Sequence, residues 1–167
     1  MDEQLHRLAK ELGESARQAR IMVTTAESCT GGWVAEALTS IAGSSLWFDR
    51  GFVTYSNLSK QEMLGVSDET LAQHGAVSEQ TVCEMAQGAL SFSQAHLAVA
   101  ISGIAGPGGA TLEKPVGTVC LAWASAGQVT HSRTERFAGN REEVRRQAVI
   151  AALKGMLVML AERDIHN

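Results

Sequence analysis

The sequence predicts a three-layer α/β/α sandwich around a mixed, mostly parallel sheet of about five strands. Helical and β-prone segments alternate along most of the 167 residues, which is the pattern of α/β domains. The segment 97–101 is continuously apolar, as expected for a strand that is covered on both faces. Two β-prone segments, 116–124 and 129–137, flank Ala126-Gly127 and predict an antiparallel hairpin, which makes the sheet mixed.

The order of elements follows from hydrophobic spacing and from capping and turn residues. Apolar residues at helical spacing predict an amphipathic helix over about 2–19. Asn140 and Glu143 predict a capping box for a final helix that runs to about residue 162. The elements expected between them and before the hairpin are, in order, a strand at 21–25, a tight turn at 26–32, a helix at 33–38, a strand at 51–55, a helix capped by Ser56-Asn57, a short helix at about 67–74 that stops at Gly75, a helix from Ser78, and the strand at 97–101.

Composition and charge exclude several classes of protein. With 45% hydrophobic and 19% charged residues, the chain is typical of one globular domain, which we expect to span 1–167. A net charge of −4 argues against a broad nucleic-acid-binding face, so no nucleic-acid partner is expected. The charged N-terminus lacks the apolar core of a signal peptide, and no apolar run approaches the roughly 18 residues of a membrane span. We therefore expect a cytoplasmic protein without a membrane partner.

The cysteines and histidines predict neither a disulfide scaffold nor a metal site. Cys29, Cys83 and Cys120 are odd in number, far apart and without a CxxC pair, which favours reduced thiols. No two of the five histidines have the spacing of metal ligands on one helix or turn. We expect no metal and no cofactor.

A first candidate site is the turn Thr25-Ala26-Glu27-Ser28-Cys29-Thr30-Gly31-Gly32, where a strand is expected to end and a helix to begin. Backbone N–H groups at such a point can bind an anion, or stabilise an oxyanion beside a nucleophile. Ser28 and Cys29 are both candidate nucleophiles: a thiolate is favoured near a helix N-terminus, whereas a serine needs a separate base. Alternatively, Ser28 or Thr30 caps the helix, and Gly31 and Gly32 only permit close packing.

A second candidate is Lys60, which follows Tyr55 and the capping residues. With Asn57 as the cap, Lys60 falls in the first helical turn, where the dipole disfavours a positive charge. Partial burial would lower the pKa of the amine further, as a general base requires. Tyr55 could orient the lysine or pack in the core, and an exposed surface lysine is the commoner alternative.

Two further stretches could bind a substrate. The loop from Ser102 through Gly103 and Gly106 to Gly109 follows a buried strand, where ligands of open α/β sheets gather, but it lacks the P-loop and dinucleotide patterns. Arg141 and Arg145 share one face at the start of the final helix and could hold a phosphate or carboxylate. Surface ion pairs are the alternative for both arginines, and the expected one for Arg146.

Together these stretches resemble the CinA C-terminal domain family. The resemblance covers about residues 20–150 and is carried by several motifs in the same order: Thr24–Gly32, Ile41–Ser45, Gly51–Asn57 with Lys60, His74–Ser78, Ser102–Pro107 and Lys114–Val119. One departure is Gly139-Asn140-Arg141, where the family often has Gly-Asp-Arg. Asn caps a helix about as well as Asp, so the fold should not change.

The resemblance implies a nicotinamide-nucleotide amidase, a metal-free serine amidohydrolase that converts nicotinamide mononucleotide (NMN) to nicotinic acid mononucleotide and ammonia in pyridine nucleotide salvage. It implies Ser28 as the nucleophile, Lys60 as the base and Tyr55 beside them, within a three-layer α/β/α fold. It also implies a homo-oligomer. Two alternatives are a catalytically silent nucleotide- or phosphate-binding paralogue linked to competence or DNA damage, and an amidase for another pyridine or small amide.

Overall fold

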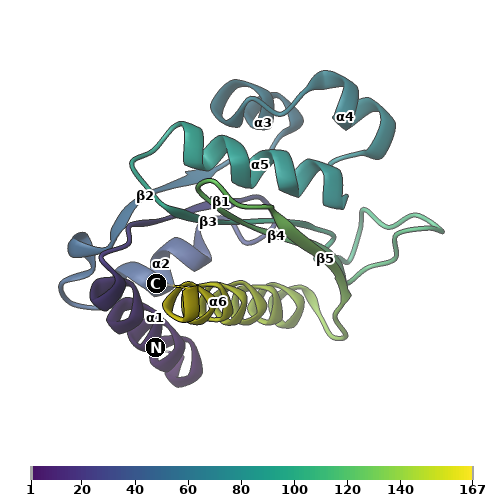
Figure 1. The fold of residues 1–167 in the computed structure, drawn as a ribbon. Helices are drawn as coiled ribbons and strands as arrows, with labels where there is room; N and C mark the ends of the chain where they lie inside the picture. The colour runs from purple at the N-terminus through teal and green to yellow at the C-terminus, as the bar shows by residue number, and fades with distance from the viewer. Residues whose placement is uncertain (1, 167) are drawn as a thin grey trace.

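The computed structural model describes the backbone of residues 2–166 and the side chains of residues 2–163. It forms one sheet between two layers of helices (Figure 1). In the described part of the chain the helices are α1 (Glu3–Ala19), α2 (Trp33–Thr39), α3 (Asn57–Leu64), α4 (Asp68–His74), α5 (Glu79–Ser91) and α6 (Arg141–His166), with a 3₁₀ turn at Ser44–Leu46. Across these residues no helix combines the length and the apolarity needed to cross a bilayer.

The sheet confirms the predicted α/β class and its mixed character. Its strands are β1 (Val23–Glu27), β2 (Phe48–Val53), β3 (Leu97–Gly103), β4 (Thr118–Ser125) and β5 (His131–Arg136), in the spatial order β2-β1-β3-β4-β5. β1 pairs in parallel with β2 and with β3, whereas β4 pairs antiparallel with β3 and with β5. β4 therefore runs against the other four strands, and β4 and β5 form the predicted hairpin.

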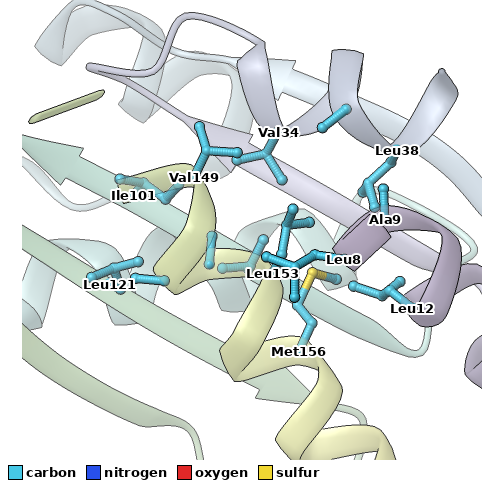
Figure 2. Close-up of a cluster of buried hydrophobic side chains, with 14 of the residues drawn as sticks. Leu8, Ala9, Leu12, Val34, Leu38, Ile101, Leu121, Val149, Leu153 and Met156 are labelled. Carbon is cyan, nitrogen blue, oxygen red and sulfur yellow. The ribbon is translucent and has the colours of Figure 1, made fainter. Parts of the chain in front are cut away.

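The two faces of the sheet carry separate hydrophobic cores. α1, α2 and α6 cover one face, and α5, with α3 and α4 beyond it, covers the other (Figure 1). β3 serves both cores because alternate side chains of a strand point to opposite faces. Val99 and Ile101 belong to the α6 side, while Ala98 and Ala100 belong to the α5 side. On the α6 side, Leu8, Leu12 and Leu38 belong to one hydrophobic cluster with Val149, Leu153 and Met156 (Figure 2).

Several predicted boundaries are corrected. β1 and β2 are displaced from the predicted 21–25 and 51–55 to 23–27 and 48–53, and α6 continues past residue 162 to His166. Pairing decides the strand boundaries, because β1 ends where its ladder to β2 and β3 ends, at Glu27. The cap of α3 is Ser56 rather than Asn57, since the Ser56 and Ser59 side chains each bond the other's backbone N–H.

Other predicted helix ends are confirmed. Ser78 caps α5, with its hydroxyl accepting from the backbone N–H of Thr81, and α4 stops at Gly75, whose φ is +77°. The Asn140 side chain accepts from the N–H of Glu143, and the Glu143 carboxylate accepts from the N–H of Asn140. This is the expected capping box of α6.

The topology gathers the candidate residues at one edge of the sheet. β1, β2 and β3 are parallel, so their carboxyl ends meet there. Ser28 follows β1, Thr54 and Tyr55 follow β2, and Ser102 and Gly103 end β3. Segments far apart in sequence are in this way brought to one place.

Candidate active site

A cavity of about 180 Å³ opens at the carboxyl ends of these strands. Six of the predicted site residues line it: Ser28, Tyr55, Lys60, Ser102, Gly103 and Arg141. Cys29, which the sequence offered as the alternative nucleophile, also lines the cavity. The lining residues that the sequence did not single out are Ala76, Val77 and Ala105. These are small or apolar side chains, and their only signal was membership of motifs that carry the family resemblance.

Ser28 and Lys60 meet in the lining of this cavity. The Lys60 Nζ lies 3.0 Å from the Ser28 Oγ, although the two residues are 32 positions apart. Lys60 is only 1% exposed and Ser28 only 7%. Lys60 reaches this place because the Ser56 capping box starts α3 just before it, so that its backbone N–H donates to the carbonyl of Ser56 in the first turn.

The surroundings of Lys60 favour a neutral amine. Burial lowers its pKa below the ordinary value of 10.5. Among the described residues no carboxylate lies within ion-pair distance of its Nζ. The amine instead faces the carbonyls of Thr54, at 2.8 Å, and Tyr55, at 3.4 Å. A neutral amine has two N–H groups and one lone pair, so it can donate to both carbonyls and accept the Ser28 hydroxyl proton.

Cys29 is a poor nucleophile in this setting. Burial, with a smaller contribution from the nearby Glu27, raises the pKa of its thiol to about 12. The thiol therefore stays protonated at neutral pH, and the thiolate expected for a cysteine at a helix N-terminus does not form. This result favours Ser28 in the choice that the chemistry of the sequence left open.

The N-terminus of α2 is already occupied by Glu27, a buried carboxylate at the end of β1. Its Oε1 accepts from the Thr30 hydroxyl at 2.7 Å and from the N–H of Val34 at 2.9 Å, and its Oε2 accepts from the N–H of Ala35 at 3.1 Å. The N–H groups of Val34 and Ala35 are therefore not available to an anion. Neither Ser28 nor Thr30 is the cap: Gly32 occupies that position in a left-handed conformation.

The predicted ligands Thr30, Gly31 and Gly32 form the turn before α2 and are not among the residues that line the cavity. The Thr30 side chain is fully buried against Glu27, so its hydroxyl does not face the cavity. Gly31 and Gly32 have φ of +59° and +102°, which explains why glycines stand here. The backbone N–H of Gly31 donates to the carbonyl of Ser28.

Arg141 bridges two walls of the cavity. Its Nη1 donates to the carbonyl of Gly106 at 2.8 Å, and its Nη2 donates to the Tyr55 hydroxyl at 3.3 Å. Tyr55 thus contacts Lys60 through its carbonyl, while its largely exposed phenol ring lies at the rim with Arg141. Gly106 contributes a carbonyl that orients Arg141.

Arg145 lies beside the cavity rather than in its lining. Its Nε donates to the carbonyl of Cys29 at 3.0 Å, its Nη2 donates to the carbonyl of Thr30 at 3.2 Å, and its guanidinium lies over the Trp33 ring. A neighbouring hollow of about 460 Å³ is lined by Trp33, Arg141, Glu142 and Arg145. Arg146 pairs with Asp2 at the surface, as predicted for it.

The described side chains suit acyl transfer by a serine nucleophile. A buried hydroxyl hydrogen-bonded to an amine of lowered pKa has the arrangement in which a serine can act as nucleophile and a lysine as its base. Among the residues that the structure describes, no three histidine, cysteine, aspartate or glutamate side chains are grouped so as to hold a metal ion.

A model of the CinA C-terminal domain matches residues 5–160. The chain belongs to the CinA C-terminal domain family. It is 58% identical over 153 residues to the nicotinamide-nucleotide amidohydrolase PncC of Escherichia coli K12, covering 92% of this chain and 93% of that protein. It is 53% identical over 155 residues to the PncC of Pseudomonas putida, covering 93% and 96%.

The fold is likewise that of solved family members. The crystal structure of the competence/damage inducible protein CihA from Agrobacterium tumefaciens superposes with a TM-score of 0.92 at 48% identity, covering 96% of this chain and 98% of that one. The predicted membership and the predicted fold are both confirmed.

Proposed function

We propose that this chain is a nicotinamide-nucleotide amidase, which hydrolyses the carboxamide of NMN to nicotinic acid mononucleotide and ammonia. The observation that carries the proposal is the 3.0 Å contact between the Ser28 Oγ and the buried Lys60 Nζ inside the cavity. Two relatives that match nearly the full chain at 53–58% identity are named nicotinamide-nucleotide amidohydrolases, which supports the choice of substrate.

In the first half of the reaction, neutral Lys60 accepts the Ser28 hydroxyl proton as the Ser28 Oγ attacks the carboxamide carbon. The C–O bond forms, and the carbonyl electron pair moves onto oxygen to give a tetrahedral oxyanion. The oxyanion collapses with cleavage of the C–N bond, and Lys60 returns the proton to the leaving nitrogen. The products of this half are ammonia and an ester of Ser28.

In the second half, Lys60 takes a proton from water, and the resulting hydroxide attacks the ester carbon. Collapse of the second tetrahedral species cleaves the bond to the Ser28 Oγ, which regains its proton from Lys60. Nicotinic acid mononucleotide leaves, and the starting state of the dyad is restored. The carbonyls of Thr54 and Tyr55 hold the amine in place during both proton transfers.

The size of the cavity suggests how the nucleotide lies. Sites for drug-sized ligands commonly enclose about 300–1,000 Å³, whereas this cavity measures about 180 Å³. The pyridine ring and its carboxamide would occupy it, with the ribose and phosphate extending past Arg141 into the neighbouring hollow. Arg141, shared by both spaces, is the residue best placed to meet the phosphate, and Ser102 and Gly103 would contact the ring. Hydrolysis of NMN would place the protein in pyridine nucleotide salvage.

The test is ammonia release from NMN in the presence of a metal chelator, with Ser28→Ala and Cys29→Ser as matched variants. We expect turnover in the wild type and in Cys29→Ser, and a loss of at least about 1,000-fold in Ser28→Ala. Nicotinamide and its riboside should be poor substrates, because they lack the phosphate. A folded wild type that binds NMN without releasing ammonia would instead indicate a silent binding paralogue. Activity retained in Ser28→Ala would refute the nucleophile.

A further inference from the structure

Glu27 is a carboxylate with 0% exposure, at the residue immediately before the proposed nucleophile. Among the described residues it has no ion-pair partner. Burying a charge without a counter-ion is costly, so the hydrogen bonds that compensate for it are informative. All three of its donors lie between the nucleophile and the first turn of α2.

The backbone on either side of Ser28 is fixed first by the sheet. The Glu27 carbonyl accepts from the N–H of Thr54 at 2.8 Å, and the Ser28 N–H donates to the carbonyl of Ile101 at 3.0 Å. Beyond Ser28 the chain leaves the sheet and must turn sharply into α2. The Ser28 carbonyl accepts from the N–H of Gly31, and the Thr30 carbonyl accepts from the N–H of Trp33, each at 3.0 Å.

This turn is held from two sides by opposite charges. On the inner side, the Glu27 carboxylate holds the Thr30 hydroxyl and two N–H groups of α2. On the outer side, the Arg145 guanidinium holds the carbonyls of Cys29 and Thr30. A cap alone would need only a short side chain at Gly32, where none is present. The turn after Ser28 is instead held by hydrogen bonds from Thr30 and from the first turn of α2 to the Glu27 carboxylate.

We propose that Glu27 is a positioning residue for the Ser28 nucleophile, acting through Thr30 and the first turn of α2. The proposal rests on the proposed function for the reaction that Ser28 performs. Glu27 does not line the cavity; it sets the path of residues 28–32 and thereby the direction of the Ser28 Oγ toward Lys60. Displacing a reacting group by about 1 Å can cost about 100-fold in rate, so the effect should appear in kcat.

The experiment compares Glu27→Gln and Thr30→Val with Thr30→Ser and with a control in the same helix, Leu38→Ala. Glu27→Gln keeps the side-chain shape but turns an amide NH₂ toward a backbone donor, and Thr30→Val removes only the hydroxyl bond. Leu38 is fully buried in the core away from the cavity, so its truncation lowers the melting temperature without touching the turn. Each protein is assayed for NMN turnover and for the rate at which a fluorophosphonate labels Ser28, well below its melting temperature.

We expect Glu27→Gln and Thr30→Val to lose about 10- to 100-fold in kcat and in labelling rate, with KM within about threefold of the wild type. Thr30→Ser should recover most of the loss, and Leu38→Ala should label and turn over like the wild type. If Glu27→Gln and Thr30→Val melt earlier but keep both rates, Glu27 is only a helix cap and the proposal is overturned. A wild type that labels at Ser28 but releases no ammonia would count against the proposed substrate alone, since the labelling rates still decide the role of Glu27.

Discussion

At the scale of single residues, the least ordinary feature of this protein is a lysine buried to 1% exposure without a carboxylate partner among the described residues. An amine in that position is stabilised in its neutral form, because burial penalises the charge. Two backbone carbonyls and the Ser28 hydroxyl provide three hydrogen-bonding partners for it. The burial that lowers this pKa would also allow the amine to act as the base of the proposed reaction.

The lowered pKa of Lys60 predicts a specific dependence on pH. As pH falls through the folded-state pKa of Lys60, the amine gains a proton and activity should decline, with the midpoint below 10.5. Between that pKa and 10.5 the unfolded chain binds the extra proton, so stability should rise with pH across this window. Lys60→Met should abolish turnover and flatten that rise.

Melting temperatures measured by circular dichroism from pH 7 to 10 check this expectation. Lys10→Met, which changes an exposed lysine of α1, is the matched control and should keep both the activity and the pH dependence of the wild type. Equal slopes in Lys60→Met and the wild type would show that Lys60 is not the group responsible.

At the scale of elements, α1 and α6 are joined at the surface by Asp2 and Arg146. Asp2 caps α1 by accepting from the N–H groups of Gln4 and Leu5 through its Oδ1. The Arg146 Nε lies 2.5 Å from its Oδ2, and this contact is the main reason that the pKa of Asp2 is lowered to about 2. One side chain therefore both starts a helix and ties it to the last one.

Two substitutions of Asp2 separate these roles. Asp2→Asn keeps an acceptor for the cap and removes the charge, whereas Asp2→Ala removes both. We expect Asp2→Ala to lower the free energy of unfolding by about 1 kcal/mol, since that is the usual loss for a cap. Asp2→Asn should cost less, because an exposed ion pair contributes about 0–1 kcal/mol.

Urea unfolding at pH 7 and at pH 3 measures both effects. Because the pKa of Asp2 is lowered, the contribution of the pair is present above 3.8 and is lost as pH falls from 3.8 toward 2. The difference between wild type and Asp2→Asn should shrink at pH 3. If Asp2→Asn destabilises as much as Asp2→Ala at pH 7, the ion pair rather than the cap dominates.

At the scale of the whole molecule, the sheet divides the interior into two cores that share β3. The β3 side chains in the α5-side core are Ala98 and Ala100, whereas those in the α6-side core are the larger Leu97, Val99 and Ile101. α5 is also pressed against α3: a Cβ added at Gly88 would lie 1.9 Å from the carbonyl oxygen of Leu64. The α5 layer therefore depends on small residues at its contacts.

Enlarging one of these residues should destabilise the fold as a whole. We expect Ala100→Leu to lower the free energy of unfolding by about 1–3 kcal/mol, because Ala100 is fully buried and a larger side chain would force the packed layers to shift. Urea unfolding at pH 7 measures the change. Val129→Leu, at a side chain that is 79% exposed, should lie within about 0.5 kcal/mol of the wild type. An Ala100→Leu protein as stable as the wild type would mean that the α5 layer is loosely packed.

The sequence by itself determined the α/β class, the order of the elements and most helix ends. Each of these depends on neighbours along the chain: helical spacing, alternation, and a capping side chain three residues from the group it bonds. The continuously apolar segment 97–101 was also sufficient to predict that β3 is buried on both faces. Strand boundaries were less accurate, because pairing with other strands sets where β1 and β2 end.

In the candidate site, too, some features follow from the local sequence and others only from the tertiary structure. Ser28, Lys60 and Arg141 could be selected from local patterns and from the family resemblance, but only the tertiary structure brought Ser28 and Lys60 to 3.0 Å and lowered the pKa of the amine by burial. It also decided that Glu27 fills the end of α2 and that Arg145 binds carbonyls of the turn. These contacts join residues through strand order and through packing against other elements, and neither is encoded in any short stretch of sequence.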